Sequence, residues 1–184
     1  MRLFTLLLLG LALAACQERL TPTTVETPRG TVTYKELVRP DDGKFEEGLR
    51  DLSVAEATRL LQSSEQAPAF IAKYVTAAQL QTDLLENLDT AFAAWLESPN
   101  PAKESSEQVE SIVGAALGQY CIARIPVHWA VATDPQGSEF VLVGGNPPTR
   151  SYPLAAVRYR IEDRKTDFIG ALYEALIHLR KKAQ

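Results

Sequence analysis

Two alternating apolar runs joined by a tight-turn sequence constrain the fold of this chain more than any other feature. Val127, Trp129 and Val131 alternate with other residues, and a second run covers residues 139–143. Between the runs, Asp134-Pro135-Gln136-Gly137 puts aspartate, proline and glycine where a type I turn favours them. Alternation with a period of two is typical of a strand with one buried face. The sequence therefore predicts an antiparallel β-hairpin.

Helical patterns precede the hairpin. In a capping box, a serine or threonine and a glutamate or glutamine satisfy each other's free backbone N–H groups, and this pattern predicts helix starts at Ser53, Thr76 and Ser105. The helix after Thr76 has the strongest pattern, because its apolar residues follow one stripe at mostly four-residue spacing. The stripe comprises Leu80, Leu84, Leu88, Phe92 and Trp95, widened by Leu85 and Leu96.

The segment after the hairpin allows two interpretations. In Pro153–Glu162, Val157, Tyr159 and Ile161 have a period of two and suggest a strand. Leu154, Val157 and Ile161 instead suit a helix with Pro153 in its first turn, which we favour. A final helix is predicted over Asp167–Lys182. Further strands are predicted over Thr31–Val38 and, as a short one, Arg150–Tyr152.

These elements predict an α+β fold, with helices packed on one side of a small antiparallel sheet that contains the central hairpin. Gly114 and Gly118 lie four residues apart in a predicted helix, which indicates close packing against a neighbour, since glycine is costly there.

Ser98-Pro99-Asn100-Pro101 marks a loop between helices or a domain boundary. We favour the loop and one domain over residues 30–184, with a mainly helical half at 30–104 and a helix–hairpin–helix half at 105–184.

The N-terminus has the pattern of an export signal. Arg2 precedes an apolar run over Leu3–Leu13 that is too short to span a bilayer, which takes about 20 residues. The next residues, Leu13-Ala14-Ala15-Cys16, resemble the lipobox of bacterial lipoproteins. That resemblance implies that residues 1–15 are removed and that Cys16 receives fatty chains, which attach a protein stably to a membrane. The alternative is an ordinary signal peptide that is cut near Cys16.

The same resemblance implies a location. Gln17 follows the cysteine, and a residue other than aspartate there favours the outer membrane in a cell that has one. The body then faces the periplasm. Residues 16–29 form the predicted anchor and flexible tether, and about 13 extended residues would hold the domain roughly 40 Å from the lipid.

Composition limits the function classes. Removal of residues 1–15 deletes one basic residue, Arg2, and leaves 18 basic against 23 acidic residues, a net charge of −5. This acidity argues against nucleic acid as a partner, because phosphate binding needs a basic face. Once Cys16 is acylated, Cys121 has no partner for a disulfide within the chain, and we expect it in the core.

The C-terminal part is similar to a family of uncharacterised small bacterial α+β domains over roughly residues 105–180. The resemblance implies a fold and no activity. It rests on Gly114-Ala115-Ala116-Leu117-Gly118, Trp129, Asp134, Gly137, Tyr152-Pro153 and Arg160-Ile161-Glu162-Asp163.

No catalytic, metal or cofactor motif stands out. His128 and His178 lack the spacing of zinc ligands, and no nucleophile elbow or phosphate loop is present. A hydrolase that uses scattered carboxylates on peptidoglycan or glycans is the alternative, because such carboxylates need only lie close in space. The adjacent pairs Asp41-Asp42 and Glu46-Glu47 are interpreted as solvated turn residues.

One charge asymmetry suggests a contact surface. Arg150, Arg158 and Arg160 lie close in sequence, followed by Arg164 and Lys165. The cluster is either a solvated rim or a surface for an acidic protein partner, with Trp129 or Tyr152 as an aromatic anchor. The sequence thus favours a lipid-anchored envelope protein that binds another macromolecule, as an immunity or inhibitor protein or as an assembly factor. The oligomeric state is left open.

Overall fold

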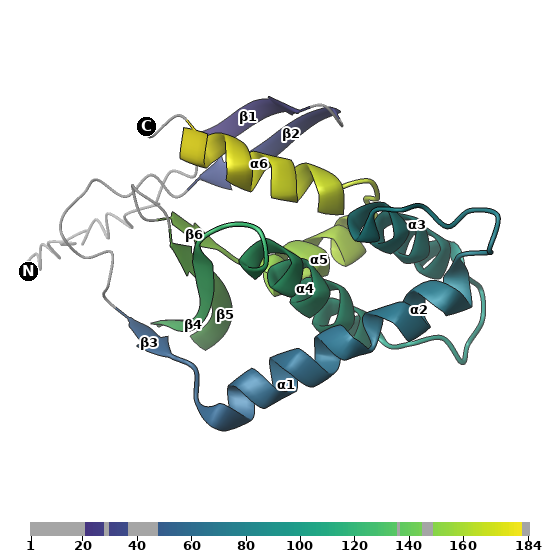
Figure 1. The fold of residues 1–184 in the computed structure, drawn as a ribbon, viewed down its shortest axis with the longest axis horizontal. Coiled ribbons are helices and arrows are strands. Elements are labelled where there is room, and N and C mark those ends of the chain that lie inside the picture. Colours follow the sequence, from purple (N-terminus) through teal and green to yellow (C-terminus); the bar gives the residue numbers. More distant parts are fainter. Residues whose placement is uncertain (1–20, 28–29, 37–47, 136, 145–148, 182–184) are drawn as a thin grey trace, which may run out of the picture.

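The computed structural model describes the backbone of residues 21–27, 30–36, 48–135, 137–144 and 149–181. The order of its elements confirms the predicted α+β class, and Figure 1 shows the larger sheet at one end with the helices beside it. The elements are β1 (Thr21–Thr27), β2 (Gly30–Glu36), β3 (Leu49–Asp51), α1 (Val54–Glu65), α2 (Ala67–Tyr74), α3 (Leu84–Glu97), α4 (Ser106–Ile122), β4 (Val127–Asp134), β5 (Gly137–Gly144), β6 (Thr149–Ser151), α5 (Pro153–Asp163) and α6 (Ile169–Lys181).

The predicted hairpin is β4–β5, the centre of an antiparallel sheet in the order β3-β4-β5-β6. Its register pairs Trp129 with Leu142, and both side chains belong to the main core with the helices. At the turn, the Asp134 carboxylate accepts the N–H of Gly137 at 3.0 Å. The other face carries a smaller cluster of Ala130, Val141 and Val143. The helices therefore cover one face of the sheet, as predicted.

Two of the three predicted capping boxes start helices. Ser53 caps α1 and Ser105 caps α4, each with the reciprocal side chain three residues later. The third prediction is wrong: the next helix begins at Leu84, not after Thr76, and Leu80 is 52% exposed rather than part of the buried stripe.

Competing hydrogen bonds explain the later start of α3. The Gln79 side chain does accept the backbone N–H of Thr76 at 3.1 Å, but it closes only a local turn. Downstream, the Asn87 amide binds both the N–H and the C=O of Gln81, at 2.8 and 2.9 Å, and holds that residue in a non-helical conformation. The carboxylate of Asp83 then accepts the N–H of Leu85 at 2.7 Å and acts as the N-cap.

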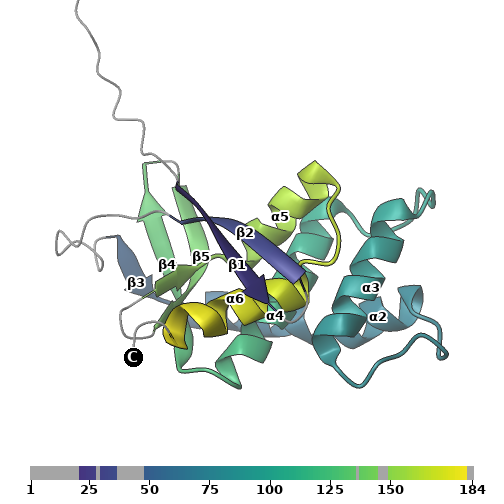
Figure 2. The same ribbon diagram turned by 90° about the horizontal axis from the view of Figure 1, so that it is seen from above.

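Residues 21–27 differ from expectation. We predicted part of a free tether, but these residues form β1, which pairs with β2 from Thr21↔Glu36 to Thr27↔Gly30. The strand predicted over Thr31–Val38 is confirmed for its described part, residues 31–36, as β2, which begins at Gly30. Figures 1 and 2 show this hairpin lying along α6. The lipobox, Cys16 and the rest of the predicted tether lie outside the described residues.

The segment after the sheet is helical, as favoured. Pro153 occupies the first turn of α5, and Arg164 ends the helix in a left-handed conformation with φ 51°. The last helix begins where the Asp89 carboxylate of α3 accepts the N–H groups of Phe168, Ile169 and Gly170 at 2.9–3.0 Å. Burial raises the pKa of Asp89, and the three N–H groups, which favour the ionised form, offset this only in part. α6 is therefore capped by a side chain from another helix.

Helix α4 is the centre of the core. Its small residues let two neighbours approach: a Cβ added at Gly114 would lie 2.7 Å from Cα of Leu154, and one added at Gly118 would overlap the Trp129 ring. This confirms the predicted close packing. Cys121 on the same helix is fully buried in the core, as expected. Among the residues that the structure describes, no helix combines the length and apolarity needed to cross a bilayer.

Replacement of Gly118 by alanine tests this packing. We expect Gly118→Ala to lower the free energy of unfolding by about 1–3 kcal/mol, because the added methyl group has no room against Trp129. Urea denaturation would measure the change. In the double variant Gly118→Ala/Trp129→Leu, the smaller leucine leaves room for the added methyl group. We therefore expect the double variant to lose less free energy of unfolding than the sum of the two single variants. Full additivity of the two single changes would contradict a direct contact.

Candidate partner-binding surface

Trp129, one of the two predicted aromatic anchors, lies in the core. Its side chain is 8% exposed, rests against Gly118 and meets the Phe140 ring edge to face, with ring centroids 6.5 Å apart. Its indole Nε1 is buried and has no hydrogen-bond partner within the described structure. Trp129 therefore joins the sheet to α4 and presents no ring to a partner.

The predicted arginine cluster is divided. Arg158 donates two hydrogen bonds to Glu110, at 3.0 and 2.8 Å, and a third to Glu139 at 2.8 Å. These bonds raise the pKa of the Arg158 guanidinium. Arg160 lies on another side of α5, since two residues of a helix differ by about 200°, and its guanidinium is 5.7 Å from the centroid of the Phe168 ring.

The remaining basic residues of the cluster also have local contacts. Arg164 binds Glu97 at 2.8 Å and Lys165 binds Asp163 at 3.1 Å. Arg150 lies on β6, opposite Val143. The structure therefore does not gather these side chains into one basic surface, because the helix separates them and acidic neighbours pair with several of them. Their role in partner contact stays a prediction.

Tyrosines, rather than arginines, mark the outer side of α5. Tyr159 is 58% exposed. Tyr152 is the N-cap residue of α5 and lies seven positions before Tyr159. Tyr152 is partly buried because it packs on the small cluster of the outer sheet face. We call Tyr152 and Tyr159 the tyrosine face.

Sequence analysis missed Tyr159 although the signal was available. The helical stripe of Leu154, Val157 and Ile161 leaves Tyr159 off the apolar side. Only the strand interpretation of the same segment counted it among inward-facing residues. Choosing the helix should therefore have moved this aromatic ring to the surface. Tyrosine is enriched in the energetically dominant parts of protein interfaces, so its exposure there is informative.

Several carboxylates that a hydrolase could use have structural partners. Asp89 caps α6, as described above. Glu104 accepts hydrogen bonds from Lys73 at 2.8 Å and from the Tyr74 hydroxyl at 2.6 Å. Burial raises the pKa of Glu104, but these hydrogen bonds outweigh burial, so the net shift is downward. The Asp41-Asp42 and Glu46-Glu47 pairs lie outside the described residues.

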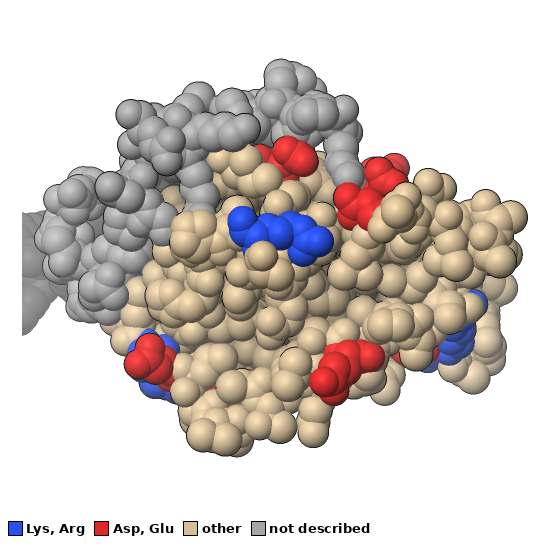
Figure 3. All heavy atoms as spheres, viewed as in Figure 1, with Lys and Arg blue, Asp and Glu red and all other residues tan. Residues whose placement is uncertain are grey.

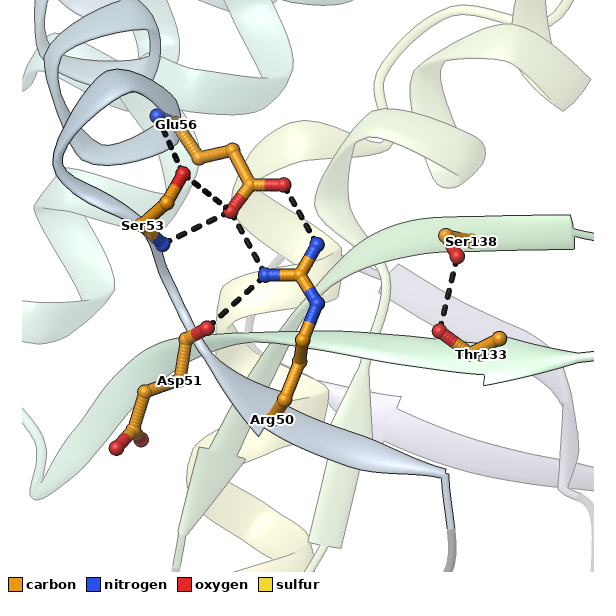
Figure 4. Close-up of polar contacts among 6 residues, drawn as sticks. All are labelled: Arg50, Asp51, Ser53, Glu56, Thr133 and Ser138. Atoms are coloured by element: carbon orange, nitrogen blue, oxygen red, sulfur yellow. Dashed lines mark hydrogen bonds and ion pairs between the residues drawn. The ribbon is translucent and has the colours of Figure 1, made fainter.

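A second polar cluster fixes the corner between β3 and α1 (Figure 4). Glu56 accepts the backbone N–H of Ser53 at 2.9 Å and binds the Arg50 guanidinium through both oxygens, at 2.8 and 2.7 Å. Arg50 also donates to the carbonyl of Asp51 at 3.0 Å. These contacts lower the pKa of Glu56, the Arg50 hydrogen bond most strongly. One carboxylate thus caps the helix and ties it to the sheet edge.

Charged side chains are sparse on one broad face. Figure 3 shows them scattered and separated by uncharged surface in the view of Figure 1, in which α1 runs along the lower edge. Val54 and Leu61, seven residues apart on α1, are 86% and 50% exposed. This helix offers a second exposed apolar side, which serves below as a control.

The histidines are not both described. His128 is exposed on the outer face of the sheet, and the side chain of His178 is not described. Among the described residues, no three His, Cys, Asp or Glu side chains are grouped so that they could hold a metal ion. Comparison of the chain with protein-family models, curated proteins and solved structures finds no match.

The pH dependence of stability should report the Arg50–Glu56 contact. The lowered pKa means that Glu56 stabilises the fold above its ordinary pKa of 4.5 and that this contribution is lost as the pH falls through the lowered folded-state value. We expect Glu56→Gln to lose stability less steeply than the parent between about pH 5 and pH 3, measured by urea denaturation.

Glutamine keeps the cap in this variant. In α4 the neutral Gln108 already accepts the N–H of Ser105 at 2.8 Å, in the arrangement that Glu56 has with Ser53. Any difference between the two pH profiles therefore reports the lowered pKa of Glu56, to which Arg50 contributes most and the N–H and hydroxyl of Ser53 contribute the rest. Parallel profiles for parent and variant would show that the pair contributes nothing.

Proposed function

We propose that this chain is a lipid-anchored protein of the bacterial cell envelope that binds another macromolecule, most directly a protein. The anchor rests on Leu13-Ala14-Ala15-Cys16. Among the described residues, the observation that carries the binding function is the exposure of Tyr159 on a helix whose other sides are held in place. An immunity or inhibitor protein and an assembly factor both fit this role.

The tyrosine face sits on a rigid support. Leu154 at the start of α5 lies against Gly114 of the central helix, and Arg158 connects α5 to Glu110 of α4 and Glu139 of β5. A helix whose backbone is already held in place loses little conformational freedom on association. Tyrosine adds a large ring with a hydroxyl and few rotatable bonds. These properties suit recognition of a folded partner.

Mass spectrometry of the protein from its native host tests the anchor. We expect residues 1–15 to be absent and Cys16 to carry a diacylglycerol through its sulfur, since the cysteine thiol is the acylated group in lipoproteins. Cys16→Ser should leave the protein without lipid and reduce its recovery with membranes, because two or more acyl chains are needed for stable attachment. An unmodified thiol, or a leader that remains attached, would contradict the proposal.

Capture from detergent-solubilised membranes tests the binding surface. We expect Tyr159→Ala to reduce recovery of the partner at least about tenfold, as for a dominant interface residue. Val54→Ala is the matched control, because it also removes an exposed apolar side chain, from a different helix. Both variants should unfold like the parent within about 0.5 kcal/mol.

Three results would contradict this assignment. Undiminished capture by Tyr159→Ala would exclude the tyrosine face. Turnover of peptidoglycan fragments without any partner above background would favour the hydrolase instead. If only Val54→Ala lost the partner, the contact surface would be α1 and not α5.

A further inference from the structure

A hollow of about 500 Å³ lies between the start of α3 and the end of α4. It is separate from the tyrosine face and plays no part in the function proposed above. It is open to solvent, so a ligand would lie against its walls and remain partly exposed. The residues that matter here are Thr82, Asp83 and Leu84 from one wall, with Gln119, Tyr120 and Arg124 from the other.

Arg124 is the cation of this hollow. Its guanidinium carbon lies 3.5 Å from the centroid of the Tyr120 ring, and one N–H is donated to the Tyr120 carbonyl at 3.3 Å. In the described part of the chain, no carboxylate lies within ion-pair distance of Arg124, whereas Arg50 and Arg164 each bind one carboxylate and Arg158 binds two. A guanidinium has five N–H donors. Arg124 thus retains donors for a ligand.

The ring beneath Arg124 is itself fixed. Tyr173 of α6 meets Tyr120 edge to face, with centroids 5.0 Å apart and planes at 86°. Stacking on a fixed ring holds the planar guanidinium in one orientation, so its edge can present two parallel N–H groups. That fork matches the geometry of a carboxylate. An ordinary solvated arginine would have to lose rotamer freedom first.

The rest of the lining selects among anions. Asp83 places a carboxylate in the same hollow, where it caps α3 through the N–H of Leu85. A doubly charged phosphate would be repelled there, with Arg124 as the one basic side chain among the described lining residues. A singly charged carboxylate would be repelled less strongly by Asp83 than a doubly charged phosphate. Leu84 adds apolar surface, and Gln119 and Thr82 add polar groups.

We propose that this hollow binds the carboxylate of an amino acid or of a peptide C-terminus, with Arg124 as the anion-binding residue. The ligand's carboxylate lies against the guanidinium edge, and its small side chain lies over Leu84. Gln119 supplies an amide for the ligand's own amide or amine. The site therefore senses or holds small carboxylate compounds rather than a folded protein.

Titration by NMR tests the site on the full chain in detergent micelles. The probes are N-acetyl-alanyl-alanine, its C-terminal amide and free alanine, and the signals followed are the Arg124 Nε–Hε group and the Gln119 side-chain amide. We expect saturable shifts with one or both acids and none with the amide. Saturation by the acetylated peptide identifies a peptide C-terminus, and saturation by free alanine alone identifies an amino acid.

Substitutions assign the binding to Arg124. Arg124→Gln should weaken binding at least about tenfold, and Arg124→Lys should fall between, because lysine keeps the charge and loses the fork. Arg59→Gln is the matched control, since Arg59 also lies over an aromatic ring, 5.0 Å from the centroid of Phe140. Equal shifts with acid and amide, parent-like binding by Arg124→Gln, or no saturable shift at millimolar concentration would overturn the proposal.

Discussion

The close contact of α4 with its neighbours is the constraint on which the rest of the structure depends. A buried helix must be covered on every side, and α4 packs against α1, α5 and the β4 strand as well as the other helices. Gly114 and Gly118 have no side chains, so the start of α5 packs directly against the first and the Trp129 ring against the second. Interiors are packed as densely as organic crystals, so these positions fix how far the sheet and α5 stand from the centre.

Polar links then set the orientation of elements that α4 brings together. Arg158 connects α5 to both α4 and β5, and Asp89 of α3 holds the N-terminus of α6. Arg50 and Glu56 join the sheet edge to α1. Exposed ion pairs contribute little free energy individually, so their main effect here is geometric. The chain uses several of its charged groups between elements rather than as one charged surface.

This use of charge explains what sequence analysis could and could not predict. Elements that depend only on residues adjacent in sequence were predicted correctly. These are two capping boxes, the hairpin with its turn and the helix that begins with a proline. The pairing of Arg158 with Glu110 and Glu139 could not be predicted, because both glutamates are remote from Arg158 in sequence. The burial of Trp129 likewise depends on Gly118, eleven positions earlier, and on the chain reversal between them.

The same limit applies to the false helix start at Thr76. The local pattern there is a good capping box, and its side-chain hydrogen bond does form. The amide of Asn87 overrides it by binding the backbone of Gln81, and Asp83 takes the cap. A pattern of four residues cannot report a competitor that lies beyond it. The α3 stripe from Leu84 onward was nevertheless predicted, because burial repeats along the helix itself.

The N-terminal hairpin changes the reach of the proposed anchor. Expected as a tether, residues 21–27 instead pair with β2 beside α6. Between a lipid on Cys16 and the start of β1 at Thr21, five extended residues span at most about 18 Å, less than half the roughly 40 Å expected of a free tether. A protein anchored in this way would hold its folded body near the bilayer surface. Its partner would then be a membrane component, or a protein that comes close to the membrane, rather than one deep in the periplasm.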